Sequence, residues 1–107
     1  MIHVIATVQL SSGARDRFLS EFAQLAPQVR AETGCIEYGA AVDVASGAAA
    51  QGPVRPDVVT IIEKWTSLDA LTAHLGIAHM KAYRERVKPF VQSVVLQVLA
   101  PAGGPAA

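Results

Sequence analysis

The chain has 107 residues, which is enough for one domain with one core, and 51% of them are hydrophobic against 17% charged, which excludes an intrinsically disordered chain. Nine basic and nine acidic residues leave no net charge, so no nucleic-acid partner is expected, and no apolar stretch approaches the roughly 18 residues of a membrane span. The single cysteine, Cys35, excludes an intrachain disulfide. With no signal peptide recognised at the N-terminus, this composition predicts a cytoplasmic protein.

The first part of the chain predicts a strand followed by a helix. Residues 2–10 (IHVIATVQL) alternate with a period of two, which is typical of a strand. Ser12 is a candidate N-cap for a helix over residues 14–32, whose apolar stripe is formed by Phe18, Phe22, Leu25 and Val29. Pro27 lies inside this stripe and predicts a kink or a break, and Gly34 is expected to end the element.

Two further strands are predicted on either side of a long loop. Residues 35–43 (CIEYGAAVD) indicate a strand, one face of which is formed by Ile36, Tyr38, Ala40 and Val42. Residues 44–56 are small and rich in glycine and proline, which predicts a mobile hairpin loop. Residues 57–65 (DVVTIIEKW) indicate the most apolar strand of the chain.

The last part of the chain predicts two short helices and a fourth strand. Ser67 can cap a helix whose inner stripe is formed by Leu68, Leu71 and Leu75. Gly76 interrupts this helix, and a second one is expected over residues 78–87. Residues 91–100 (VQSVVLQVLA) indicate a strand, and residues 101–107 predict a flexible C-terminal tail.

The order β-α-β-β-α-β predicts a ferredoxin-like α+β fold with a four-stranded antiparallel sheet, formed by one domain over residues 1–100. The helices of such a fold cover one face of the sheet, and the other face is usually polar. Here large aliphatic residues occupy both faces of three strands: Ile5 opposes Val4, Val59 and Ile61 oppose Val58 and Ile62, and Val95 and Leu99 oppose Val94, Leu96 and Val98. Since burying each such side chain contributes about 1.5–3 kcal/mol, the pattern predicts a homodimer with the two sheets face to face. A monomer with an unusually apolar sheet is the alternative.

Glu63 and Trp65 close the third strand and point to the same face, with Cα atoms roughly 6.5–7 Å apart. Trp65 could form a pocket wall and donate its indole N–H to a ligand oxygen. Alternatively, Trp65 fills the core and Glu63 pairs with a neighbouring basic group. The residues alone leave both interpretations open.

Two histidines flank Gly76. His74 lies beside the apolar stripe and His79 opens the next helix, and either could act as a general base near neutral pH. The alternative is that each is a hydrogen-bonded residue at the boundary of the core. Tyr83 follows His79 by four residues and could contact it on one helical face. No third ligand suits a metal, and no G-x-G-x-x-G motif or P-loop is present, so no metal, nicotinamide or flavin is expected.

Residues 32–38 (ETGCIEY) follow the pattern E-x-G-C-x-x-Y, and residues 63–74 (EKWTSLDALTAH) follow E-x-W-x-S-x-x-x-L-x-x-H. With Gly13 before the first helix and His79 shortly before Tyr83, these passages resemble the antibiotic biosynthesis monooxygenase family. The resemblance covers nearly the whole chain.

The resemblance implies a dimeric α/β barrel with a pocket between sheet and helices in each subunit. For some members it implies oxygenation of aromatic substrates by O₂ without a metal, flavin or other cofactor. In this chain it implies catalytic roles for His74 as base (or His79) and for Trp65 and Tyr38 as hydrogen-bond donors, with substrate contacts from Glu63, His79 and Tyr83. The chain contains no asparagine, which disfavours the haem-degrading relatives.

The expected function is a cofactor-independent monooxygenase that oxidises a quinol, phenol or aromatic polyketide-like substrate. Its expected partners are a small aromatic molecule, O₂ and a second copy of the chain. The first alternative is a non-catalytic ligand-binding or stress-related dimer that uses the same pocket. A less favoured alternative is a lyase or isomerase acting on a small hydroxy-ketone, which would need the histidines but no oxygen.

Overall fold

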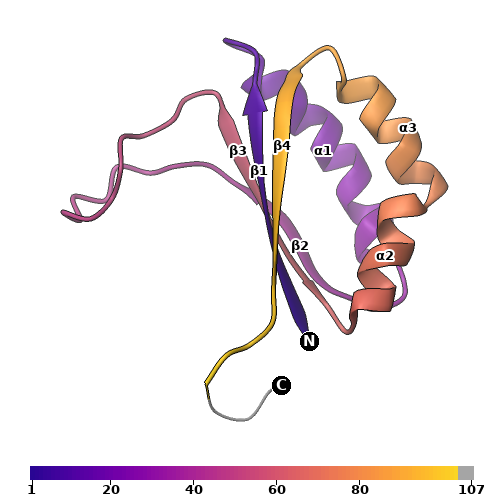
Figure 1. Ribbon diagram of the computed structural model, residues 1–107. Coiled ribbons are helices and arrows are strands. Elements are labelled where there is room, and N and C mark those ends of the chain that lie inside the picture. The colour runs from indigo at the N-terminus through magenta and orange to yellow at the C-terminus, as the bar shows by residue number, and fades with distance from the viewer. Residues whose placement is uncertain (104–107) are drawn as a thin grey trace.

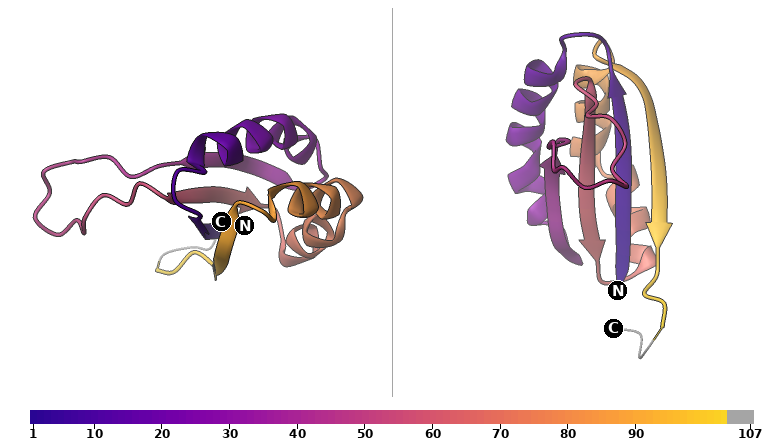
Figure 2. Two further views of the ribbon diagram at one scale, coloured as in Figure 1. Left: turned by 90° about the horizontal axis from the view of Figure 1, so that it is seen from above. Right: turned by 90° about the vertical axis from the view of Figure 1, so that its left-hand side faces the viewer.

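The computed structural model describes residues 1–103 as a four-stranded antiparallel sheet with helices on one face (Figures 1 and 2). The elements in chain order are β1 (Ile2–Leu10), α1 (Arg15–Arg30), β2 (Cys35–Ala41), β3 (Val58–Trp65), α2 (Leu68–Gly76), α3 (Ala78–Val87) and β4 (Val91–Leu99). The strand order is β2-β3-β1-β4, which confirms the predicted ferredoxin-like α+β fold. Of the predicted tail, residues 104–107 lie outside the described residues. Among the residues that are described, no helix has the length and apolar character needed to cross a membrane.

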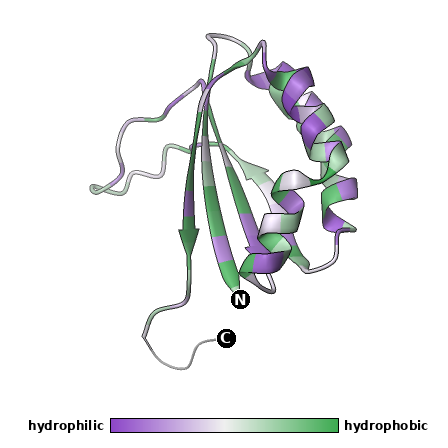
Figure 3. Cartoon of the chain, turned by 45° about the vertical axis from the view of Figure 1, so that its right-hand side comes forward, coloured by the Kyte–Doolittle hydropathy of each residue, from purple (hydrophilic) through white to green (hydrophobic). Residues whose placement is uncertain are grey.

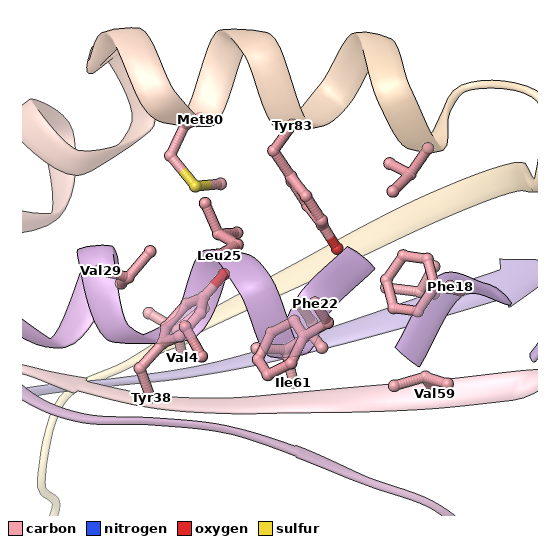
Figure 4. Packing of buried hydrophobic residues seen from close by; sticks show 14 of the residues in the cluster. Val4, Phe18, Phe22, Leu25, Val29, Tyr38, Val59, Ile61, Met80 and Tyr83 are labelled. Carbon is pink, nitrogen blue, oxygen red and sulfur yellow. The ribbon is translucent and has the colours of Figure 1, made fainter. Parts of the chain in front are cut away.

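The core lies between α1, α3 and the inner face of the sheet, which is the face that the helices cover (Figure 4). The predicted apolar stripe of α1 is buried, and so are the alternate residues of β1 that face it, namely Val4, Ala6, Val8 and Leu10. Each of the larger side chains contributes about 1.5–3 kcal/mol on burial. The two sequence periods therefore determine which sides of α1 and β1 face each other.

The start of α1 and its proline differ from the prediction. The N-cap residue is Ala14, not Ser12, and no side chain caps the helix. The N–H of Ala14 instead donates to the carbonyl of Ser11 at 3.0 Å, which closes a turn before the helix. Pro27 does not break the helix, because it lies in the last turn and removes only the N–H that would bond the carbonyl of Ala23.

A β-bulge at the start of β2 also departs from the predicted alternation. Cys35 pairs with Trp65 whereas Glu37 pairs with Lys64, so Ile36 is an extra residue in β2. The side chain of Ile36 is 52% exposed. Of the four alternate residues predicted to share one face of this strand, only Tyr38 is buried, opposite Glu63 of β3.

The inner side of α2 is formed by Leu71 and His74, which are 4% and 2% exposed. Ser67 caps the helix as predicted, because its side chain accepts a hydrogen bond from the N–H of Ala70 at 3.1 Å. The predicted stripe of three leucines is wrong, since Leu68 and Leu75 are exposed. A histidine thus takes an interior position that the sequence pattern assigned to leucine.

β4 is an edge strand that the helices leave largely uncovered. Val94 and Leu96, on its inner face, are 53% and 41% exposed, and Val95, on its outer face, is 61% exposed. Ile62 of β3 lies on the same outer face and is also exposed. Figure 3 shows the apolar character of these strands. The outer face therefore presents apolar side chains that no helix within residues 1–103 covers.

Residues 42–57 connect β2 to β3 and project away from the sheet (Figures 1 and 2). Arg55 bonds Asp43 through two nitrogens, with an Nε–Oδ2 distance of 2.7 Å and an Nη2–Oδ1 distance of 2.9 Å. The side chain of Gln51 donates to the carbonyl of Val44 at 2.7 Å. This segment coincides with the predicted hairpin loop and lies away from the helices.

Candidate active site

A cavity of about 450 Å³ lies between α3 and the inner face of the sheet. Its wall is largely apolar and includes Ala6, Phe18, Ile61, Met80, Val91 and Leu96. Four buried polar side chains border it, namely Tyr38, Glu63, His74 and Tyr83. A cavity of this size and character, with few convergent polar groups, suits a small organic ligand, since such pockets usually measure about 300–1,000 Å³.

Glu63 and Trp65 project from the same face of β3, as their spacing predicted, and this is the face that the helices cover. The indole Nε1–H of Trp65 donates to Oε1 of Glu63 at 2.9 Å, and the two residues are 0% and 5% exposed, respectively. Burial raises the pKa of the Glu63 carboxyl above its usual value, the bond from Trp65 opposes this rise, and the charge of Glu32 adds to it. Trp65 lies behind Glu63, outside the cavity lining, so its N–H is used within the protein and not offered to a ligand.

His74 lies at the centre of the polar groups. Its ring centroid is 4.6 Å from that of Trp65 and 5.6 Å from that of Tyr38. Its Nε2 lies 4.0 Å from Oε1 of Glu63, which also borders the cavity. Burial lowers the pKa of the His74 imidazole, although the neighbouring Glu32 carboxylate opposes this, so the neutral ring is favoured near pH 7.

Glu32 holds the second nitrogen of His74. It lies in the turn between α1 and β2, and both of its carboxylate oxygens are 3.1 Å from Nδ1 of His74. A carboxylate can only accept, so Nδ1 carries the proton and Nε2 of the neutral ring is free to take one. Sequence reasoning quoted Glu32 only as the first residue of a family pattern and gave it no role. That pattern was the one available signal, because Glu32 and His74 are 42 residues apart.

Tyr38 and Tyr83 face the cavity from opposite sides. Tyr38 rises from β2 toward the helices, while Tyr83 and Met80 point from α3 toward the sheet (Figure 4). Burial is the main cause that raises the pKa of both phenols, so both hydroxyls stay protonated at neutral pH. Each can therefore donate a hydrogen bond to an oxygen atom in the cavity.

His79 lies apart from the cavity. Its Nε2 is 2.6 Å from Oε2 of Glu32, and its side chain is 22% exposed in a surface depression that Glu32 also lines. The structure places Tyr83 in the cavity and His79 in this depression, so the expected site at which the two meet is not formed. Within residues 1–103, no three histidine, cysteine or carboxylate side chains are arranged to hold a metal ion.

The fold and this cavity define a small ferredoxin-like α+β protein with a buried histidine–carboxylate site between sheet and helices. The model of the antibiotic biosynthesis monooxygenase family matches residues 1–86. The chain is 40% identical over 103 residues to the "Probable quinol monooxygenase YgiN" of Escherichia coli (strain K12), covering 94% of this chain and 98% of the relative. The chain therefore belongs to the antibiotic biosynthesis monooxygenase family.

Solved structures agree with this fold. Rv0793 from Mycobacterium tuberculosis is 25% identical, with coverage of 96% of each chain and a TM-score of 0.74. PA3566 from Pseudomonas aeruginosa is 22% identical, with coverage of 95% of this chain and 94% of the other and a TM-score of 0.77. At 22% identity, the similarity to PA3566 shows only that the two proteins share a fold.

Proposed function

We propose that this protein is a monooxygenase that uses O₂ to oxidise a quinol or polycyclic phenol without a bound cofactor. The observation that carries the proposal is His74, a buried imidazole with Nδ1 held by Glu32 and Nε2 near Glu63 at an apolar cavity. Family membership and the name of the E. coli relative support the same class of reaction.

The chemistry follows from the ionisation of the substrate. His74 takes the proton of a substrate hydroxyl at Nε2, and the resulting phenolate is electron-rich enough to reduce O₂ itself. The neutral hydroxyls of Tyr38 and Tyr83 donate to the developing oxyanion, and the apolar wall keeps water from it. The reaction balances as quinol plus O₂ giving hydroxyquinone plus water, in which the substrate supplies the electrons and one oxygen atom is incorporated.

The remaining predicted site residues have supporting roles in this proposal. Glu63 contacts the substrate from the cavity wall, and Trp65 is a positioning residue that fixes the Glu63 carboxylate through its indole N–H. His79 contacts Glu32 and not the substrate. The role of His79 is developed below.

We also propose that the protein is a homodimer in which the outer faces of two sheets pack together. The outer face carries Ile62 and Val95, which are 38% and 61% exposed, and no helix of the described chain covers them. Contiguous exposed apolar surface of this kind commonly marks an interface. A cytoplasmic location remains a prediction from the sequence.

The test is oxygen incorporation by metal-free and flavin-free protein. Reduced naphthoquinols and polycyclic phenols are incubated with ¹⁸O₂, and one labelled atom is expected in the product above the rate of autoxidation. His74→Gln should lower kcat by about 10²–10⁴-fold, the usual contribution of a general base. The control is Thr72→Gln, which introduces glutamine on the exposed side of the same helix, α2, and should leave kcat unchanged.

Two results would decide against the proposal. If His74→Gln formed labelled product at the same rate, His74 would not be the general base. If no substrate in the panel gave labelled product, the proposed monooxygenase activity would be wrong. Thermal stabilisation by aromatic ligands without turnover would then favour the non-catalytic binding protein. Turnover of a hydroxy-ketone under nitrogen would favour the lyase or isomerase.

A further inference from the structure

A line of four polar side chains leads from the cavity wall to a different surface of the protein. Glu63 lies 4.0 Å from Nε2 of His74, and Nδ1 of His74 lies 3.1 Å from Glu32. Oε2 of the same carboxylate, which is also 3.1 Å from Nδ1 of His74, lies 2.6 Å from Nε2 of His79. The last three groups are thus joined by hydrogen bonds, with one carboxylate shared between two imidazoles.

The two ends of this line open in different places. The cavity lies between α3 and the sheet, whereas the depression at His79 is lined by the end of α1, by α2 and by the start of α3. Side-chain exposure rises along the line, from 2% at His74 to 7% at Glu32 and 22% at His79. The inner end is therefore shielded from water and the outer end is in contact with it.

We propose that Glu32 and His79 form a proton conduit that connects His74 to solvent on the side of the protein away from the cavity. The proposal rests on the proposed function, in which His74 takes a proton from the substrate. Glu32 and His79 are positioning and relay residues in this scheme, since neither touches the substrate.

The proton transfers balance along the line. When the substrate hydroxyl gives its proton to Nε2 of His74, the proton on Nδ1 passes to Glu32. Nε2 of His79 carries a proton in its contact with the Glu32 carboxylate, so His79 first exchanges through solvent to the tautomer protonated at Nδ1. Its Nε2 then accepts the proton from Glu32, and its Nδ1 releases one to water. Imidazole suits this role because it accepts a proton at one nitrogen and releases another from the second. The partly exposed His79 can exchange between its two neutral tautomers through solvent. A proton returns by the same path when the second oxygen atom leaves as water.

The groups around His74 explain why the proton would not leave through the cavity. A bound substrate fills that route, and the guanidinium of Arg84 lines it, held by a bond from Nη2 to the carbonyl of Leu75. A proton moving that way would approach a fixed positive charge. On the other sides His74 faces Glu63 and Tyr38, which lead back to the cavity, and Trp65, which is fully buried. Glu32 leads instead to the depression at His79.

The first test needs no turnover. In ¹⁵N-labelled full-length protein, the exchange of the Nδ1–H of His74 with water is measured by NMR magnetisation transfer. His79→Gln keeps a polar side chain near Glu32 but cannot relay a proton, so exchange should slow about tenfold or more, and Glu32→Gln should slow it similarly. Lys81→Gln, an exposed position on the same helix, should exchange like the unmodified protein. Unchanged exchange in His79→Gln would overturn the conduit.

The second test uses turnover of the active quinol. His79→Gln should lower kcat about tenfold with KM unchanged and should raise the solvent deuterium isotope effect, as expected when proton transfer limits the rate. Normal kcat in His79→Gln would overturn the catalytic role of the conduit even if exchange were slowed. If the unmodified protein oxidises no quinol, the proposed function fails, and the exchange measurement still decides whether the conduit exists.

Discussion

Replacing Trp65 by phenylalanine keeps an aromatic ring in the core but removes the N–H that donates to Glu63 at 2.9 Å. The side chain of Glu63 is 7% exposed, so the change leaves a mostly buried carboxylate with one hydrogen bond fewer. A hydrogen bond to a charged group is worth about 1.5–3 kcal/mol and one between neutral groups about 0.5–1.5 kcal/mol. We therefore expect the Trp65–Glu63 interaction to contribute about 1.5–3 kcal/mol when Glu63 is ionised.

A double-mutant cycle isolates this energy. Trp65→Phe, Glu63→Met and the double variant are unfolded in urea at one protein concentration, and the coupling free energy is taken from the four unfolding free energies. The smaller ring leaves the same void whether or not Glu63 is present, so that cost cancels. Methionine is unbranched, similar in length and offers no strong acceptor.

The pH dependence of the coupling makes the test specific. Below the usual carboxyl pKa of 4.5, and therefore also below the raised pKa of Glu63, the carboxyl is protonated. The coupling should then fall to the neutral range of about 0.5–1.5 kcal/mol. A coupling under about 0.5 kcal/mol at neutral pH, or one that acid leaves unchanged, would refute the assignment of this bond to an ionised Glu63.

Three further predictions follow from other features. Burial lowers the pKa of His74 below its usual 6.5, so just below pH 6.5 the folded protein binds fewer protons than the unfolded chain. The free energy of unfolding should therefore fall as the pH drops through this range. In urea titrations, His74→Gln should weaken this pH dependence. Gly34→Ala places a Cβ 2.6 Å from Cβ of Ala70 at a φ of +85° and should cost about 1–3 kcal/mol or more, whereas Gly39→Ala, which meets nothing within 4 Å, should be tolerated; equal urea midpoints would contradict this. Val95→Lys should shift the protein from dimer to monomer in sedimentation velocity, while Val44→Lys, on the projecting connection, should not; a monomeric unmodified protein would rule out the dimer itself.

The parts of the fold that the sequence predicts well are those set by burial of a continuous apolar face. The stripe of α1 and the alternation of β1 are examples, because each residue on those faces contacts the same core. The bulge at Ile36 leaves no such trace, since an inserted residue changes the pairing with β3 but not the local composition. The cap at Ala14 was missed for a similar reason, because a backbone turn replaces the expected side-chain bond.

The sequence predicted some members of the candidate site but not the contacts that connect them. His74, Glu63 and Tyr38 were named from their types and positions, and the structure brings them to one cavity. Glu32 was passed over because its importance arises from contact with His74, 42 residues away, and His79, 47 residues away. The residues alone left Trp65 either in a pocket wall or in the core; the structure buries it, and its partner two residues earlier on β3 takes its N–H.

The uneven distribution of polar groups around the cavity has a consequence for how this protein can diversify. The groups that handle protons come from β2, β3, α2, α3 and the turn after α1, whereas β4 contributes only Val91, Val94 and Leu96 to the wall. Because β4 is an edge strand that the helices do not cover, changes in its side-chain volume reshape the chamber without displacing a reactive group. Substitutions in β4 can therefore change which substrates fit the cavity while the reaction is retained, which makes β4 the place to begin engineering new selectivity.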